Sequence, residues 1–187
     1  EPTAPTDTLA AGGGHAHCGA LIYLGDNWPD EHRGRLFTHT LHGHQINQQA
    51  NRRLGSGFDT VHAGRDQFFC SDPRYVAVDL QYGPDGAVYI IDWYDQQHCH
   101  NPNTERWDRG NGRVYRMSYT AGFRPVKVNL AEDSDRALVA RLDHRNAWYG
   151  RTARRLLQER ARSSSLGLEL QLELPRPLHV LIDRGKF

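Results

Sequence analysis

Histidine is the most conspicuous residue type with chemical potential in this chain, and nine of the eleven histidines lie between His15 and His100. The first group is HAHC, residues 15 to 18. On an extended segment His15 and His17 share one side, and Cys18 points to the other. Two imidazoles spaced in this way can share a zinc, copper or iron ion if a third ligand joins them. The alternative is structural: the histidines bond loop carbonyls at a strand start, and Cys18 packs as a small buried hydrophobe.

A second group lies in FTHTLHGHQ, residues 37 to 45, where Gly43 allows a tight turn at the end of a strand. His42 and His44 share a parity, and they would meet His15 and His17 if the two strands pair antiparallel. Such a cluster would form a transition-metal site with these four histidines as ligands, or it would supply a general base. The structural alternative is that the histidines are partly exposed and bonded to water.

A third group is DWYDQQHCH, residues 92 to 100, which follows an apolar run. Asp92 and Asp95 suit a hard cation such as Ca²⁺, and with Trp93 they are the candidates for binding a cofactor. Asp92 paired with His98 would instead form an acid and base pair. The catalytic candidates are therefore His42, His44, Asp92 and His98. The structural alternative is that Asp92 anchors the loop by accepting backbone N–H groups.

Short strands are the elements that must position these groups. Between residues 15 and 120, short apolar runs alternate with turn signals, and no helical period of a dozen residues appears. The clearest unit is RYVAVDLQYGPDGAVYIIDWYD, residues 74 to 95, in which Pro84-Asp85-Gly86 predicts a hairpin turn. The return strand is apolar on both faces, so we expect an inner strand covered on both sides. The expected strands are 20 to 24, 35 to 40, 45 to 51, 75 to 80, 87 to 93, and 113 to 119 as the outer strand of the same sheet.

The pattern changes in the last third of the chain. Residues 131 to 161 show helical spacing, with Asp133 or Ser134 placed to cap a first helix and Asn146 placed to cap a second. Such a helix pair has the form of one solenoid repeat. The expected organisation is a flexible lead-in over residues 1 to 14, a partial β-propeller over 15 to 120, a helical repeat over 128 to 161, and an irregular tail over 162 to 187.

Composition limits the function classes. A net charge of +1 with 38% hydrophobic residues fits a globular chain and does not indicate a nucleic-acid partner. No stretch approaches the roughly 20 apolar residues of a membrane span. Cys99 before His100 lacks the upstream cysteine of a C-x-x-C-H motif, so no covalent haem is expected in this chain. The chain begins without methionine, from which we expect a piece of a longer protein.

Three stretches together resemble a known family: GHAHCGALIYLGDNWPDEHRGRLFTHTLHGHQINQ, YGPDGAVYIIDWYDQQHCH and NGRVYRMSY. They are similar to the C-terminal propeller blades and first HEAT-like repeat of the membrane-bound dehydrogenase-type proteins of planctomycetes and verrucomicrobia. Those proteins are related to soluble quinoprotein glucose and sorbosone dehydrogenases. The resemblance covers roughly residues 14 to 160.

The resemblance implies a mainly β fold, with about two blades of a β-propeller followed by an α-helical, HEAT-like hairpin. It implies oxidation of sugars or alcohols with pyrroloquinoline quinone (PQQ) and Ca²⁺, a cytochrome c as electron acceptor, and a periplasmic or cell-surface location. A propeller needs ~4 to 8 blades. We therefore expect the remainder of the propeller, in a longer parent chain or a complex, as the partner without which this segment is not stable.

Two other functions fit the same residues. One is a non-catalytic propeller and helical-repeat scaffold that binds glycans or protein partners. The other is a histidine-based metal-binding module, in which His15, His17 and either His42 or His44 hold an ion.

Overall fold

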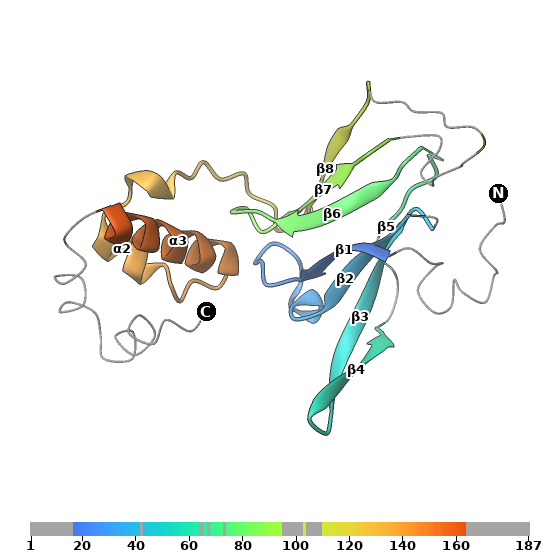
Figure 1. The fold of residues 1–187 in the computed structure, drawn as a ribbon, viewed down its shortest axis with the longest axis horizontal. Coiled ribbons are helices and arrows are strands. Elements are labelled where there is room, and N and C mark those ends of the chain that lie inside the picture. The colour runs from blue at the N-terminus through green and yellow to red at the C-terminus, as the bar shows by residue number, and fades with distance from the viewer. Residues whose placement is uncertain are drawn as a thin grey trace. The chain divides into compact units, whose positions relative to one another are not determined.

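The computed structural model describes residues 17–41, 43–63, 66, 68–72, 74–94, 103 and 110–163 (Figure 1). The chain divides into two compact units, residues 1–127 and 128–187. The described part of the first unit consists of two antiparallel sheets, and that of the second unit is helical. The fold is therefore mainly β with a small helical portion. The lead-in over residues 1 to 14 lies outside the described residues.

The first sheet is an antiparallel meander in which consecutive strands are neighbours. A short 3-10 turn, η1 (Asp30–His32), connects its first two strands. The last two strands were not expected from the sequence, because one is polar and exposed and the other has only two residues. The strands run β1 (His17–Ile22), β2 (Leu36–Thr40), β3 (Gln45–Leu54) and β4 (Gly57–His62), and β5 (Phe68–Phe69) also pairs with β3.

The second sheet has the order β6 (Ala77–Tyr82), β7 (Val88–Asp92), β8 (Arg113–Met117). Its hairpin turn is the predicted one, and Gly86 takes the positive φ of +72° that the turn requires. The Asp85 carboxylate holds the turn, accepting from the Ala87 N–H at 3.2 Å and from the Tyr89 hydroxyl at 2.8 Å. The predicted hairpin and the outer position of β8 are both confirmed.

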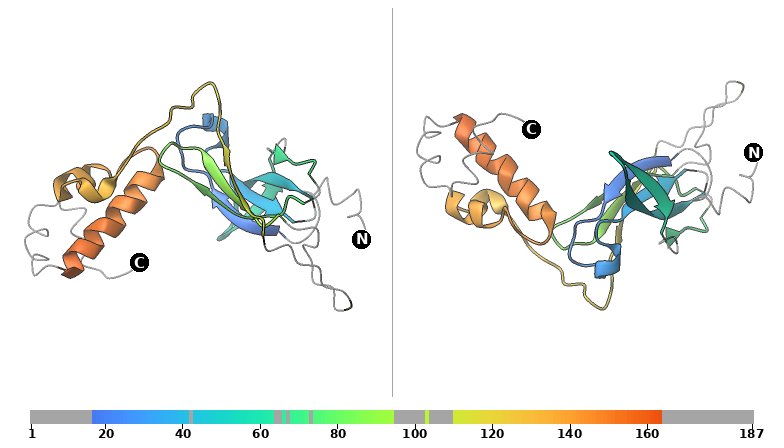
Figure 2. Two further views of the ribbon diagram at one scale, coloured as in Figure 1. Left: turned by 90° about the horizontal axis from the view of Figure 1, so that it is seen from above. Right: turned by 90° about the horizontal axis from the view of Figure 1, so that it is seen from below.

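The two sheets meet where β1 and β2 lie against β6 (Figures 1 and 2). Gly19 makes this approach close: at φ +62° it interrupts the β1 register, and a Cβ there would sit 3.0 Å from the Asp79 Cα. Each large apolar side chain buried in this core contributes about 1.5–3 kcal/mol to stability. The largest apolar side chains buried there are Tyr23, Phe37, Ile46, Tyr75, Leu80 and Ile90.

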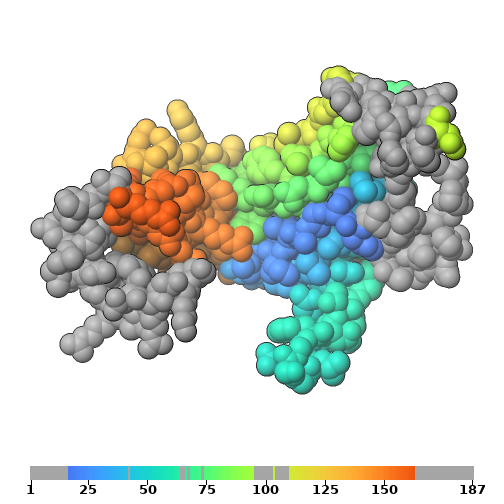
Figure 3. Space-filling model, viewed as in Figure 1, coloured from blue at the N-terminus to red at the C-terminus, as the bar shows by residue number. Residues whose placement is uncertain are grey.

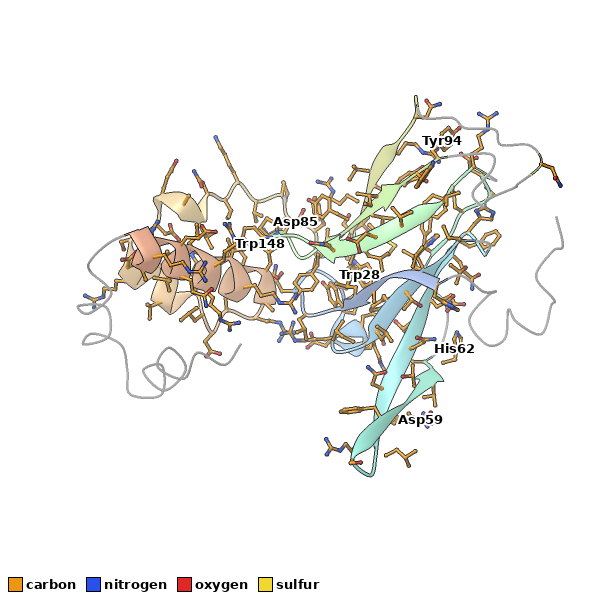
Figure 4. All side chains as sticks on the ribbon, in the orientation of Figure 1. Trp28, Asp59, His62, Asp85, Tyr94 and Trp148 are labelled. Atoms are coloured by element: carbon orange, nitrogen blue, oxygen red, sulfur yellow. The ribbon has the colours of Figure 1, made fainter. Side chains whose placement is uncertain are left out.

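Tyr23 joins the turn after β1 to the hairpin turn of the second sheet. Its hydroxyl donates to the Gly86 carbonyl at 2.7 Å and accepts from the N–H groups of Asn27 and Trp28 at 3.0 and 2.8 Å. The Trp28 indole donates to the Met117 carbonyl at 3.1 Å, and Trp28 is labelled in Figure 4. The turn from Gly25 to Pro29 therefore joins the two sheets through Tyr23 and Trp28. We call this set of hydrogen bonds the Tyr23 clamp.

One expectation about β7 is met only in part by the described residues. Val88 and Ile90 are buried, but Ile91 is 47% exposed and its cross-strand neighbour Val114 is 69% exposed. The strand is central in its sheet, yet only one of its faces is covered by the described residues. Apolar residues on both faces of the strand indicated its central position correctly but not its burial.

The second unit contains η2 (Leu130–Glu132), α2 (Asp135–Ala140) and α3 (Ala147–Ser163). Ser134 caps α2 by accepting from the Ala137 N–H, and Asn146 caps α3 by accepting from the Trp148 N–H. Both caps were predicted, and the choice between Asp133 and Ser134 falls to Ser134. The helix pair packs around Leu130, Leu138, Tyr149 and Ala153.

The basic end of α3 is used within its own unit. Arg160 donates to the carbonyls of Ala131 and Asp133 and to the Asp135 carboxylate, so it ties α3 to the start of α2. Because α3 extends to Ser163, its last two residues belong to the helix and not to the tail expected from residue 162, and residues 164–187 lie outside the described part. Among the described residues, no helix is long and apolar enough to cross a membrane.

Candidate functional site

The candidate residues fall into two sets. His15, His42, Asp95 and His98 lie outside the described residues. His17, His44, Asp92 and Trp93 are described, and they occupy ends of β1, β3 and β7. Their partners show what each described side chain can do.

Asp92, the last residue of β7, is buried and has both carboxylate oxygens engaged. Oδ1 accepts from the Val76 N–H at 2.8 Å and from the Tyr94 N–H at 2.9 Å. Oδ2 accepts from the Arg113 Nε at 2.8 Å and lies 2.7 Å from its Nη2. The pairing of Asp92 with Arg113 is also a cross-strand pair of the β7–β8 ladder. This arrangement is the backbone anchor that the sequence offered as the structural alternative for Asp92.

Arg113 extends the anchor to a second carboxylate. Its Nη1 donates to Asp72 Oδ2 at 3.1 Å, and its guanidinium lies 3.6 Å from the centre of the Tyr94 ring. Partial burial alone would lower the pKa of Arg113, but the hydrogen bonds to Asp92 and Asp72 outweigh that effect and raise it. The pKa of Asp72 lies below its usual value, first because of the Arg74 N–H and then because of Arg113.

The chain turns sharply at this anchor. Tyr94 has a positive φ of +58°, uncommon for a residue with a side chain, because both its N–H and its ring are held by the Asp92 and Arg113 pair. Trp93, between Asp92 and Tyr94 in the sequence, has 48% of its surface exposed, and its N–H donates to the Val76 carbonyl at 2.9 Å. The backbone is fixed, while the Trp93 side chain faces outward.

His44 is tied to the segment before β6. Its Nδ1 bonds the Tyr75 carbonyl oxygen. Because a carbonyl only accepts, this contact places the ring proton of neutral His44 on Nδ1. The backbone carbonyl of His44 accepts from the Cys70 N–H at 2.8 Å, and the residue has a positive φ of +49°. His44 is thus part of the connection between the two sheets.

His17 lies on the face of the first sheet that points away from the second sheet. Its Nε2 is 3.2 Å from the Asn47 side-chain nitrogen, whereas the adjacent Cys18 contacts the second sheet. The predicted opposition of His17 and Cys18 is therefore confirmed. His17 and His44 have separate partners, and within the described residues no three or more His, Cys, Asp or Glu side chains are arranged as metal ligands.

His39 is the buried histidine that the candidate set omitted. It is fully buried in the core between the sheets, and its Nδ1 lies 3.7 Å from the Cys18 Sγ. The thiol donates to the Ala77 carbonyl at 3.0 Å, and the imidazole ring packs edge-on against Tyr75 with ring centres 5.3 Å apart. Burial, and then the neighbouring His44, lowers the pKa of His39 to about 4.

The surroundings of His39 keep ionisable groups neutral. Burial, reinforced by Asp79, raises the pKa of the Cys18 thiol. Burial and the nearby Asp92 raise the pKa of the Tyr75 hydroxyl. The Tyr75 hydroxyl and His39 Nε2 are buried and have no hydrogen-bond partner among the described residues. At neutral pH the cluster therefore holds a neutral imidazole, a thiol and a phenol in contact with the β6 backbone.

The described residues do not fit the Ca²⁺ site that the resemblance implies. A cation bound to Asp92 would have to displace the Arg113 guanidinium from Oδ2 and two backbone N–H groups from Oδ1. Asp95, the second expected ligand, lies outside the described residues.

Comparison with known families gives one match. Residues 6–121 match the family model described as "Domain of unknown function (DUF7133)". No curated protein matches the chain, and no solved structure matches it.

Proposed function

From the geometry of this chain, which belongs to the DUF7133 family, a domain of unknown function, we propose that the β unit is a non-catalytic scaffold built from two neighbouring blades of a β-propeller. The observation that carries the proposal is that the buried Asp92 carboxylate accepts hydrogen bonds from the N–H groups of Val76 and Tyr94 and from the Arg113 side chain. Three hydrogen bonds and the ion pair with Arg113 already engage both carboxylate oxygens, so action as a general base or a cation ligand would compete with the anchor.

The strand order supports the two blades. A propeller blade is an antiparallel sheet of about four strands, and both sheets here are meanders of consecutive antiparallel strands. The contact between them is made by β1 and β2 of the first sheet and β6, the first strand of the second. The Tyr23 clamp and the His44 bond to the Tyr75 carbonyl join the same two sheets.

The described candidates support a structural role as a group. Asp92, His44 and Cys18 contact Val76, Tyr75 and Ala77 respectively, which are consecutive residues leading into β6. Three polar groups from three different strand ends thus bond one short stretch of backbone. Buried backbone groups need such partners, so these side chains have a sufficient reason to be present without a substrate.

Ligand-induced stabilisation of the whole chain tests this function against the dehydrogenase. A ligand that binds only the folded state raises the melting temperature. We expect neither Ca²⁺ alone nor PQQ with Ca²⁺ to raise the melting temperature, whereas Asp92→Asn lowers the free energy of unfolding by about 3 kcal/mol because it leaves Arg113 without its buried partner. The matched control is Asp72→Asn, a partly exposed partner of the same Arg113, with an expected cost below about 1 kcal/mol.

A different result restores the quinoprotein alternative. If PQQ and Ca²⁺ raise the melting temperature of the wild type but not of Asp92→Asn, Asp92 is a cofactor ligand. Reduction of an artificial dye with aldoses or alcohols by the loaded protein would then identify the reaction. If PQQ and Ca²⁺ raise the melting temperature of Asp92→Asn as much as that of the wild type, the cofactor binds at another site. That result would also contradict the non-catalytic scaffold.

A further inference from the structure

The hairpin of β3 and β4 projects from the first sheet (Figure 3). β3 pairs with β2 from Gln45 to Gln49 and with β4 from Gln49 to Leu54, so the second half of β3 continues past β2. Residues 51–60 are all exposed, including Leu54 at 68% and Phe58 at 65%. We call residues 51–60 the hairpin arm. A two-stranded ribbon that buries neither face is marginally stable by itself.

The outer edge of the arm is unprotected. Within the described residues, β4 is the last strand of its sheet and pairs only with β3. Proteins commonly guard such an edge with lysine, proline or a bulge. β4 has the sequence GFDTVH, with Asp59 as its one acidic residue and no lysine or proline, and its register with β3 runs without a bulge. Phe58, Thr60 and Val61 of this edge are residue types that favour strands.

The turn determines which backbone groups face outward. Leu54 and Gly57 close a two-residue turn at Gly55-Ser56, with Gly55 at φ +58° as a type II′ turn requires. The closing pair of such a hairpin is hydrogen-bonded, and bonded pairs alternate along the ladder. Gly57, Asp59 and Val61 thus bond β3. The N–H and C=O groups of Phe58, Thr60 and His62 point away from β3, toward solvent.

We propose that this edge pairs with the same edge of a second copy of the chain, antiparallel about a two-fold axis at Thr60. In that register Thr60 faces Thr60 of the second copy, Phe58 faces its His62, and Asp59 faces its Val61. Every outward backbone group of these residues gains a partner. The two hairpin arms together form a four-stranded ribbon.

Self-complementarity is the reason for choosing a second copy over an unrelated strand. No like charges face each other directly, since Asp59 meets a valine; the two Asp59 residues are diagonal neighbours, and each has Arg52 opposite it on its own β3. The exposed Phe58 gains an imidazole across the new ladder, and aromatic cross-strand pairs stabilise sheets. His62 is exposed at the far end of β4, where its Nε2 bonds Asp66 at 3.0 Å, and its position on the hairpin is seen in Figure 4.

The test is sedimentation of the whole chain with two substitutions at one position. Thr60→Pro removes an N–H that points away from β3, so it breaks the intermolecular ladder and leaves the β3–β4 ladder intact. Thr60→Val keeps the N–H. Both lose the Thr60 hydroxyl bond to Asn51, which makes them a matched pair. We expect a reversible dimer whose association weakens at least about tenfold in Thr60→Pro and changes less than about twofold in Thr60→Val.

Amide hydrogen exchange of the wild type gives a second measurement that needs no substitution. On raising the protein concentration, the amides of Phe58, Thr60 and His62 should gain more protection than those of Asp59 and Val61, which already bond β3 in the monomer. A chain that stays monomeric at all concentrations would overturn the proposal. Protection of the Phe58, Thr60 and His62 amides that appears only when an unrelated strand-forming peptide is added would overturn it as well. A dimer that Thr60→Pro leaves as stable as Thr60→Val uses another surface and contradicts it equally.

Discussion

Asp92 illustrates how far a single residue's role can be derived from sequence. Its place at the end of an inner strand was predicted, and so was the option of a backbone anchor. Arg113 was not predicted as its partner, although the signal was present: the last residue of one strand faces the first residue of the next in an antiparallel pair. The predicted strand order brings this end of β7 close to Arg113, but the exact pairing depends on β7 ending at Asp92, one residue before the predicted end of that strand.

His39 could not be identified in the same way. Alternation along β2 places it on one face of the sheet, but its burial arises from contacts with β6 and Tyr75, which are far away in the sequence. The metal-site hypothesis concentrated on histidines of equal parity at strand ends, and His15 and His42 lie outside the described residues. That hypothesis stays a prediction.

The buried His39 makes stability depend on pH. Burial lowers its pKa from 6.5 in the unfolded chain to about 4 in the folded protein. Between these values the unfolded chain binds a proton that the folded chain does not bind, so the free energy of unfolding falls as the pH falls. The full effect is about 3 kcal/mol, reached near pH 4. Urea unfolding from pH 7 to pH 4 measures this change.

Two histidine variants separate this effect from general acid sensitivity. His39→Gln removes the buried titrating group, and the decline between pH 6.5 and 4 should flatten even though the variant is less stable at pH 7. His62→Gln replaces an exposed histidine and serves as the control for the substitution itself. If both variants keep the wild-type slope, His39 does not titrate as its burial requires.

At the scale of elements, turn chemistry was the most reliable guide. The Pro84-Asp85-Gly86 hairpin, the inner and outer strands beside it, and the caps of α2 and α3 all followed from local residue types. The strands β4 and β5 were missed because neither has an apolar periodicity. The Gly25 to Pro29 turn was recognised as a turn, but its role as a clamp depends on Tyr23 and Gly86, which lie in different sheets.

The clamp predicts a difference between two glycines of similar φ. Gly86→Ala would place a Cβ 2.5 Å from the Asn27 nitrogen at φ +72°, so both strain and overlap oppose it. At Gly34, φ is +78° but no atom lies within 4 Å of the added Cβ. We expect Gly34→Ala to cost about 1 kcal/mol and Gly86→Ala about 3 kcal/mol or more. Chemical denaturation compares the two, and equal costs would contradict the close contact between the turns.

At the scale of the whole molecule, the open face of the second sheet is the feature that local reasoning described least well. The sequence predicted coverage of β7 on both sides, and the described residues cover one. If the proposed propeller is correct, the exposed pair of Ile91 and Val114 is where a following blade would lie. On this view the sequence pattern records a contact with a blade that the described residues do not contain.

Replacing this pair tests the neighbour without disturbing the chain itself. Ile91→Lys together with Val114→Lys should change the free energy of unfolding of the chain by less than about 1 kcal/mol, because both side chains are largely exposed. If the proposed propeller is correct, the same change should abolish co-purification with its remaining blades expressed as a separate polypeptide, since two charges would be buried without partners. Leu54→Lys, on the hairpin arm, serves as the control and should leave co-purification intact. Retained co-purification of the Ile91 and Val114 double variant would show that the neighbouring blade does not use this face.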